Sequence, residues 1–243
     1  MPRRRAAPIP NRAPLACLVA LAALQAGDAH AQAYQCAIPR SVALPDIPRD
    51  GPVRRLPVTG YTLALSWSPE YCKPREGSGH HARQCSGRSG RFGLVVHGLW
   101  PESGRSWPQW CPAPPATAQD AAANLCLSPS ASLVARQWAK HGSCMARRPA
   151  TYFKVTRILW DGLRIPDYDR VSREDALTAG TIRTRFADAN PGWFGDAIGV
   201  KLNERGWLEE LRLCYDKGFM PTRCDAARFG ADDAVRAKIW RGL

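Results

Sequence analysis

Residues 61–67, Tyr-Thr-Leu-Ala-Leu-Ser-Trp, form a largely apolar stretch of residues that favour an extended backbone. A second apolar run, Phe-Gly-Leu-Val-Val at residues 92–96, leads directly into His97. Residues 73–91, between the two runs, are rich in Gly, Ser and Arg, a composition typical of a loop. The sequence therefore predicts two buried strands joined by a polar loop, with a histidine at the end of the second strand.

Further along the chain the pattern changes to one that favours helices. We expect helices over residues 130–140, 152–163 and 181–189, and a late strand over residues 208–215. Strands and helices mix without a regular βαβ repeat, which predicts the α+β class. The second of these helices is expected to contact the core through Phe153, Ile158, Leu159 and Leu163.

Residues 1–31 have the layout of a signal peptide. An Arg-rich start precedes an apolar run at residues 15–24, which is too short to span a bilayer. Ala-His-Ala at residues 29–31 then has the small-x-small form of a cleavage site. We expect cleavage before Gln32, export to the periplasm or out of the cell, and no membrane span elsewhere in the sequence.

The mature chain is expected to consist of an arm and one domain. Residues 32–57 are rich in Pro and Arg with little periodicity, which predicts an extended arm. Residues 58–243 show no internal repeat and no linker long enough to divide them. We therefore predict a single domain over residues 58–243.

Composition restricts the class of protein and the kind of partner. The chain has 243 residues, 45% of them hydrophobic and 23% charged, which excludes wholesale disorder and collagen-like repeats. Lys and Arg number 34 against 21 Asp and Glu, a net charge of +13. This surplus favours a polyanionic partner such as nucleic acid, although Arg-rich coding in a GC-rich host is an alternative explanation.

The cysteines indicate a disulfide framework. Nine cysteines, less Cys17 in the expected signal peptide, leave eight in an exported chain. Local spacing suggests two pairs, Cys72–Cys85 around the polar loop and Cys214–Cys224 around a turn. A zinc site is the alternative, but the sequence contains neither CxxC nor His-x-x-x-His. The other pairs stay open, because eight cysteines allow about a hundred pairings.

The first segment with chemical potential is His-Gly-Leu-Trp-Pro at residues 97–101. A histidine at the end of a buried strand is well placed at the edge of a cleft. Gly98 permits close approach of a backbone or a ligand, and Trp100 offers a flat surface on which a base can stack. Taken alone, the segment is explained better by a core histidine beside a core tryptophan.

The second such segment ends the helix expected over residues 130–140. Gln137, Lys140 and His141 have the spacing i, i+3 and i+4, so on a helix they share one face. The ammonium group could stabilise charge on phosphate oxygens while the imidazole transfers a proton. Taken alone, the pattern fits equally well a solvated helix end whose basic residues complement the helix dipole.

Together the two segments supply a complete set of groups for cleaving RNA through its own 2'-hydroxyl. That reaction requires a base, an acid and a cation, and it requires no metal. Two histidines suit the first two roles because imidazole ionises near pH ~6.5. We therefore predict His97, His141 and Lys140 as catalytic. The remaining histidines of the mature chain, His80 and His81, lie in the polar loop and are expected to be solvated.

The two segments, in this order, resemble the active-site segments of the ribonuclease T(2) family. The resemblance covers most of residues 60–225. It implies an α+β fold with a central antiparallel sheet, packed helices and disulfides. It also implies endonucleolytic cleavage of single-stranded RNA through a 2',3'-cyclic phosphate, with low base specificity and no cofactor.

The resemblance also implies individual roles. His97 matches the general acid, His141 the general base, and Lys140 the lysine that steadies the phosphorane. Trp100 matches a base-stacking tryptophan, and Glu102 falls where the family often has an acidic residue that touches the base.

One further disulfide follows from the resemblance. The family normally bonds the cysteine at position 144 to one shortly after the first segment, and Cys111 is the nearest candidate. This pairing leaves Cys36 and Cys126 as the fourth pair.

The second segment departs from the family pattern His-Glu-Trp-x-Lys-His-Gly at two positions. Arg136 replaces a histidine that helps to hold phosphate, a change that keeps phosphate binding possible. Gln137 replaces a glutamate and loses its charge, so we expect weaker turnover or a shifted pH optimum, and a higher activity for Gln137→Glu. In the loop after the first segment, Trp107 and Trp110 are candidate aromatic walls for a base, or else pack around Cys111.

The leading hypothesis is an exported, monomeric endoribonuclease whose partner is single-stranded RNA. The alternative is a catalytically weakened or inactive protein that binds RNA or another polyanion on the same fold. A metal-dependent nuclease would need clustered carboxylates, and none stands out near either segment.

Overall fold

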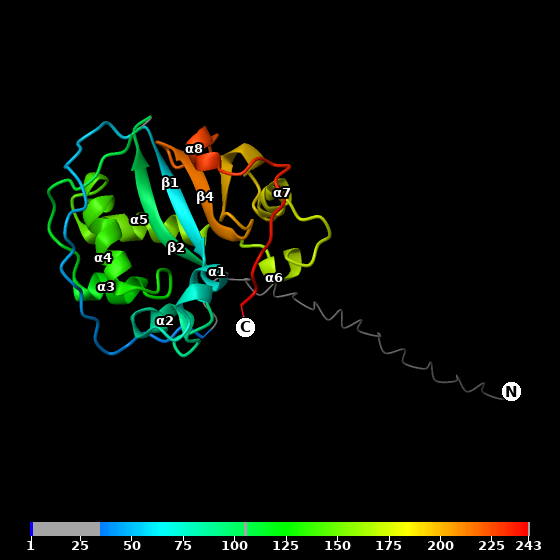
Figure 1. The fold of residues 1–243 in the computed structure, drawn as a ribbon, viewed down its shortest axis with the longest axis horizontal. Coiled ribbons are helices and arrows are strands. Elements are labelled where there is room, and N and C mark those ends of the chain that lie inside the picture. The colour runs from blue at the N-terminus through cyan, green and yellow to red at the C-terminus, as the bar shows by residue number, and fades with distance from the viewer. Residues whose placement is uncertain (2–34, 105, 243) are drawn as a thin grey trace.

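The computed structural model describes Met1 and residues 35–104 and 106–242, so the expected signal peptide beyond Met1 lies outside the described residues. At its centre is a four-stranded antiparallel sheet with the strand order β2-β1-β4-β3 (Figure 1). The strands are β1 (Gly60–Trp67), β2 (Leu94–Glu102), β3 (Ile198–Leu202) and β4 (Leu208–Asp216). One antiparallel sheet with packed helices confirms the expected α+β class.

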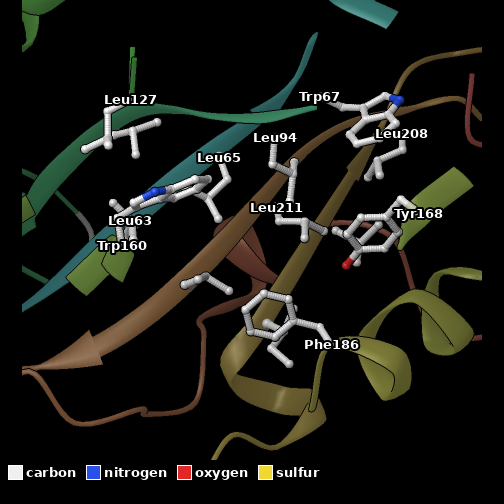
Figure 2. Close-up of a cluster of buried hydrophobic side chains, with 14 of the residues drawn as sticks. Leu63, Leu65, Trp67, Leu94, Leu127, Trp160, Tyr168, Phe186, Leu208 and Leu211 are labelled. Carbon is white, nitrogen blue, oxygen red and sulfur yellow. The ribbon is translucent and has the colours of Figure 1, made fainter. Parts of the chain in front are cut away.

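The two faces of the sheet have different chemistry. Along β1, alternation directs Leu63 and Leu65 to one side, where they join Leu211 of β4 in the hydrophobic core (Figure 2). Thr62 and Ser66 point to the opposite side. We call the first side the apolar face and the second the polar face. The polar face carries the candidate site.

Helices cover the apolar face. Helix α4 (Ala131–Lys140) and α5 (Pro149–Asp161) pack against β2, and α7 (Ala179–Ala189) packs against β3. Figure 1 shows α3, α4 and α5 on the β2 side of the sheet, and α6 and α7 on the β3 side. The other helices are α1 (Ser68–Cys72), α2 (Ala82–Cys85), α3 (Ala118–Asn124), α6 (Tyr168–Val171) and α8 (Ala226–Phe229), with 3-10 turns at Lys73–Arg75, Gly79–His81, Gly142–Cys144 and Gly195–Ala197.

Most expected elements are found with nearly the predicted bounds, with two exceptions. The loop expected over residues 73–91 contains α2 and two 3-10 turns, and the strand expected over residues 92–96 has other bounds, beginning at Leu94. The strand expected over residues 92–96 does not end before His97 but continues to Glu102. It continues because β1, its neighbour in the sheet, pairs with it along its whole length, from Gly60 to Trp67. The histidine therefore lies within the strand and not in a loop after it.

Two further differences concern periodicity. Ile158, expected in the core, has 60% of its surface exposed. The buried stripe of α5 instead runs through Tyr152, Thr156 and Trp160 at the helical repeat, and Ile158 falls on the opposite side. The five-residue strand β3 was not predicted, because it is too short to show clear alternation.

A β-bulge interrupts the pairing of β2 with β1. Ala64 pairs with Gly98 and the next residue, Leu65, pairs with Val96, so His97 is the extra residue. A bulge bends the strand and re-aims the side chain of the extra residue. This local irregularity is what directs the His97 side chain across the polar face.

Four disulfides join Cys36–Cys126, Cys72–Cys85, Cys111–Cys144 and Cys214–Cys224. These are the four pairs proposed from local spacing and from the family resemblance.

Residues 35–57, the described part of the arm, form no helix but are bonded to the rest of the protein near both ends. Cys36–Cys126 anchors its start. Near its end, Arg54 and Gln109 exchange two backbone hydrogen bonds of 2.9 and 3.0 Å. In Figure 1 the arm runs along the outer side of α3 and α4 before the chain enters β1.

Among the helices of the described residues, none has the length and apolar character needed to cross a membrane.

Removing a disulfide should lower the stability of the protein by an amount that depends on the length of the loop which that disulfide closes. Cys36–Cys126 spans 90 residues and Cys214–Cys224 spans 10. Because the entropy lost by the unfolded chain grows with loop length, Cys36→Ser/Cys126→Ser should lower the free energy of unfolding by about 5 kcal/mol. Cys214→Ser/Cys224→Ser, as the comparison, should lower it by about 3 kcal/mol. Urea denaturation followed by circular dichroism checks the order, and a larger loss for the shorter loop would contradict it.

Candidate active site

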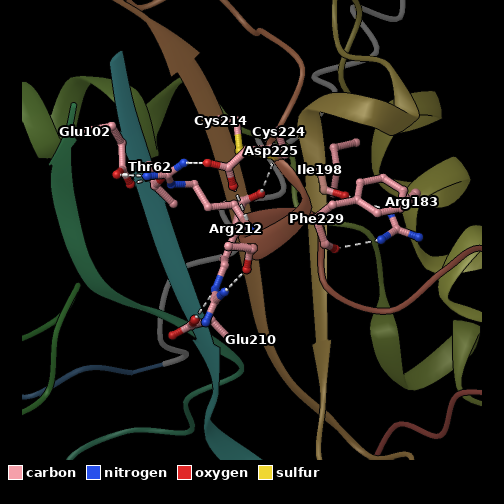
Figure 3. Close-up of a disulfide and its surroundings, with 12 residues drawn as sticks. Thr62, Glu102, Arg183, Ile198, Glu210, Arg212, Cys214, Cys224, Asp225 and Phe229 are labelled. Carbon is pink, nitrogen blue, oxygen red and sulfur yellow. Dashed lines mark hydrogen bonds and ion pairs between the residues drawn. A yellow bond between two sulfur atoms is a disulfide. The ribbon is translucent and has the colours of Figure 1, made fainter. Parts of the chain in front are cut away.

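The centre of the polar face is a hydrogen-bonded row that starts at His97. The His97 side chain is about a third exposed, and its Nδ1 lies 2.7 Å from Oε2 of the buried Glu210 on β4. Arg212 donates its Nε–H to the other oxygen of Glu210 at 2.9 Å (Figure 3). Glu210 thus fixes the histidine from a strand two positions away in the sheet.

Glu210 is charged in this environment. Burial alone would raise the pKa of its carboxyl, but hydrogen bonds and charge interactions with His97 and Arg212 hold the pKa below its ordinary value of 4.5. Because Nδ1 of the imidazole is engaged by this carboxylate, Nε2 is the ring nitrogen left to exchange a proton with a ligand.

Helix α4 positions the second group of candidate residues. The helix is capped by Ser130, whose hydroxyl accepts from the backbone N–H of Leu133, and its buried face includes Val134 and Trp138. It ends at Lys140, and the backbone N–H of the capping residue His141 still donates to the carbonyl of Gln137. The helical repeat therefore presents the predicted catalytic residues of this segment at the C-terminal end of α4.

His141 is held in an environment that disfavours its charged form. Burial is the main cause, and the charges of Lys140, His97 and Arg136 add to it, lowering the pKa of His141 to about 3. Asp50 of the arm acts in the opposite direction. Within the described part of the chain, Nδ1 of the buried imidazole has no hydrogen-bond partner. The imidazole is therefore neutral across the physiological range of pH.

Trp100 lies between the two histidines. Its ring centroid is 5.1 Å from that of His97 and 5.8 Å from that of His141. Its indole N–H donates to Oε1 of the buried Gln137 at 2.8 Å. A Cβ at Gly98 would come within 2.1 Å of that same oxygen, so only glycine leaves room for the contact. Gln137 therefore fixes the tryptophan and is not directed at Lys140.

A groove of about 890 Å³ opens beside His97. Arg136 contributes to its wall from α4, and the loop between β1 and β2 contributes to the opposite side. The side chains between β1 and β2 that line the groove include Tyr71, Arg75 and the two histidines that were expected to be solvated, His80 and His81.

The structure does not leave Glu102 free to contact a base. One oxygen accepts from the Thr62 hydroxyl at 2.8 Å, and the other is paired with Arg228 of α8 (Figure 3). Its side chain is 12% exposed. The expected role in base recognition is corrected to a structural one: Glu102 attaches α8, next to the Cys214–Cys224 disulfide, to the polar face.

The two tryptophans of the following loop differ. Trp107 is 41% exposed, with the Arg54 guanidinium 4.4 Å from its ring centroid, and remains a candidate contact for a base. Trp110 is only 4% exposed and donates its indole N–H to Asp50. The expectation that Trp110 forms a wall for a base is therefore wrong, because its ring is enclosed near the Cys111–Cys144 disulfide.

Part of the sequence matches a known protein family. Residues 59–168 match the sequence profile of the Ribonuclease T2 family. This segment belongs to the ribonuclease T2 family. The match includes both motifs and the strand that precedes the first of them.

Two curated bacterial proteins are similar to the chain. A probable ribonuclease of Haemophilus influenzae is 31% identical over 186 residues, which are 71% of this chain and 63% of that protein. A ribonuclease of Aeromonas hydrophila is 42% identical over 89 residues, which are 35% of this chain and 36% of that protein. The matched parts thus cover less than two thirds of either relative.

The fold is shared with solved ribonuclease structures. Trichomaglin, described as an S-like ribonuclease, superimposes with a TM-score of 0.61 at 20% identity, covering 76% of this chain and 98% of its own. This likeness confirms the expected ribonuclease T2-like fold, with helices packed on a central antiparallel sheet.

Sequence reasoning on the T2 motifs missed two carboxylates. Glu210 bonds to His97 from β4, and Asp50 bonds to Lys140 and Arg136 from the arm. Neither lies near a motif in the sequence: the separations from His97 and Lys140 are 113 and 90 residues. Only the strand order and the path of the arm bring them to the site.

The Glu210 contacts predict an acid-dependent loss of stability. Because its pKa is lowered in the folded protein, Glu210 contributes stability above pH 4.5 that is lost as pH falls through the folded pKa. Glu210→Gln should therefore be about 2 kcal/mol less stable than the wild type near neutral pH, and this difference should vanish in acid. Urea unfolding in steps from about pH 7 to about pH 3 measures it. A difference that does not change with pH would contradict the assignment.

Proposed function

We propose that this T2 protein is an endoribonuclease that cleaves single-stranded RNA through a 2',3'-cyclic phosphate, with low base specificity and without a metal or cofactor. One observation carries the proposal: His97 and His141 flank Trp100, with Lys140 and Arg136 beside them. This set contains a proton donor, a proton acceptor, a surface for a base and two cations for a phosphate.

His141 acts as the general base in this proposal. It removes the proton of the 2'-hydroxyl, whose oxygen then attacks phosphorus. Its neutral state at physiological pH suits this role, since a base must be unprotonated. A bound phosphate would offset the charges of Lys140 and Arg136 and would thereby raise the basicity of the imidazole when substrate is present.

His97 acts as the general acid. Its Nε2–H protonates the 5'-oxygen as the bond from phosphorus to that oxygen breaks. Glu210 keeps the ring oriented through its contact with Nδ1, which leaves Nε2 for the substrate. In a second step His97, now unprotonated, would remove a proton from water, whose oxygen attacks phosphorus. His141, now protonated, would give its proton to the 2'-oxygen as the bond from phosphorus to that oxygen breaks, which leaves a 3'-phosphate.

Lys140 and Arg136 stabilise the negative charge that develops on the phosphorane oxygens. The Lys140 side chain is 20% exposed and the Arg136 side chain 39% exposed, so both remain accessible. Gln137 holds Trp100, on which the base stacks. The groove lined by Arg136 and the basic loop would receive the RNA strand, and binding there should weaken with salt.

We also propose that the protein acts after export, as a monomer in the periplasm or outside the cell. The layout of residues 1–31 supports export. The four disulfides support it as well, since such bonds persist in oxidising compartments.

Incubation of the oxidised protein with single-stranded RNA and with the matching DNA, both in EDTA, tests the proposal. Mass spectrometry should find 2',3'-cyclic phosphate ends from RNA and intact DNA, because only RNA has the attacking hydroxyl. Folded protein that binds RNA without cleaving it would favour the non-catalytic alternative. Cleavage that disappears in EDTA would contradict metal independence.

The two histidines should be separately essential. His97→Ala and His141→Ala are each expected to lower kcat by about 10²–10⁴-fold, because each removes one proton-transfer partner. RNA binding, measured by fluorescence anisotropy, should remain, since the cations and Trp100 are unchanged. Circular dichroism controls for folding. Unimpaired cleavage by either folded variant would overturn the site assignment.

A further inference from the structure

Asp50, in the N-terminal arm, contacts both candidate phosphate-binding cations. Its Oδ2 accepts from Nζ of Lys140 at 3.0 Å and is also paired with Nη2 of Arg136. Its Oδ1 accepts from the indole N–H of Trp110 at 3.0 Å. Both carboxylate oxygens are therefore engaged, and all three partners belong to α4 or to the loop after β2.

Hydrogen bonds hold the part of the arm around Asp50 in place. Arg54 and Gln109 are joined by two backbone hydrogen bonds, and the Gln109 side chain donates to the carbonyl of Pro52 at 2.8 Å. The neighbouring backbone N–H of Trp110 donates to the carbonyl of Lys140 at 2.8 Å. Arm, loop and the end of α4 thus form one bonded unit that holds the carboxylate in place.

The charged groups around His141 indicate a function for the Asp50 carboxylate. His141 is surrounded by Lys140 and Arg136 from α4 and by His97 from β2, whose own partner is Glu210. Gln137 on the same helix is an uncharged amide. Among the described charged groups that act on His141, Asp50 is the one that favours its protonated form. Lys140 and Arg136 in turn lower the pKa of Asp50 to about 2, mainly through the hydrogen bond from Lys140, so the carboxylate stays charged.

We propose that Asp50 is a positioning carboxylate of this active site, which orients Lys140 and Arg136 toward the phosphate and supplies the negative charge that Gln137 does not. This inference rests on the proposed ribonuclease function. Asp50 itself does not touch the reacting atoms. It holds both cations through the same oxygen, Oδ2, and it preserves the basicity of His141.

Position 137 could carry the negative charge in place of position 50. Residue 137 lies one helical turn from Lys140 and from His141, and is buried beside them. A glutamate at position 137 would keep an acceptor for the indole N–H of Trp100 and would place a negative charge one helical turn from Lys140 and His141. A second substitution at that position can therefore restore the charge that is lost at Asp50.

The test compares the wild type with Asp50→Asn, with Asp50→Asn/Gln137→Glu, and with Asp188→Asn as the matched control. Asp188 is an exposed carboxylate on α7, paired only weakly with Arg185 at 3.7 Å, so its substitution removes the same charge away from the site. Steady-state cleavage of a short single-stranded RNA is measured in EDTA from neutral pH down to about pH 3, because the pKa of the His141 imidazole is lowered to about 3.

Asp50→Asn should lower kcat about tenfold, since a charge-assisted contact to the catalytic cations is lost. KM should not rise, because an anion that competes with phosphate for the two cations has gone. The acidic limb of the profile of kcat/KM against pH should move to lower pH by roughly half a unit, since the His141 pKa falls. The double variant should recover most of kcat, and Asp188→Asn should match the wild type.

Three results would overturn the proposal. The first is an Asp50→Asn enzyme with unchanged kcat and an unchanged acidic limb, as expected for a purely structural arm contact. The second is an increase in kcat/KM with an unmoved pH profile, which would identify Asp50 as an autoinhibitory group. The third is a folded double variant that recovers nothing, which would mean that the charge cannot be supplied from position 137.

Two readouts remain if the wild type does not cleave RNA, and they separate failure of this inference from failure of the proposed function. Inorganic phosphate should bind Asp50→Asn several-fold more tightly than the wild type at fixed ionic strength. Imidazole resonances followed by NMR should show His141 titrating at lower pH in Asp50→Asn only. Unchanged phosphate affinity and an unchanged titration would reject Asp50 as an electrostatic part of the site.

Discussion

The hydrogen bond between His97 and Glu210 depends on the central position of β1 in the sheet. Because β1 pairs with β2 on one side and with β4 on the other, residues 113 positions apart in sequence lie on one face. The intervening residues of β1 on that face are Ala64 and Ser66, whose small side chains leave space for Glu210 to reach across. The bulge at His97 completes the geometry by turning the imidazole toward it.

The surroundings of His141 are opposite in character to those of His97. His97 is paired with a buried carboxylate, whereas His141 is enclosed without a partner at Nδ1 and faces two cations. In the proposed mechanism the first imidazole donates a proton, and the second, which burial and the two cations hold neutral, accepts one. Placing two identical side chains in unlike environments is how one active site obtains an acid and a base at the same pH.

The arm and the disulfides connect the site to the rest of the molecule. Cys36–Cys126 anchors the start of the arm, and Cys111–Cys144 joins the loop after β2 to the end of α4. Asp50 lies within the unit that these crosslinks and the Arg54–Gln109 bridge define. Disulfides therefore hold together the three segments that meet at Lys140, in addition to stabilising the fold.

The sequence by itself determined the α+β class, the strand over residues 61–67, the helix that carries Lys140, and the two motifs, because each is a local pattern of periodicity or spacing. Such patterns extend over a few residues, so they do not report contacts between distant segments. Only the tertiary structure decided that Glu102 pairs with Arg228, that Trp110 is enclosed, and that Glu210 and Asp50 join the site. Strand order, the bulge and the path of the arm set those contacts, and they are fixed only when the whole chain packs.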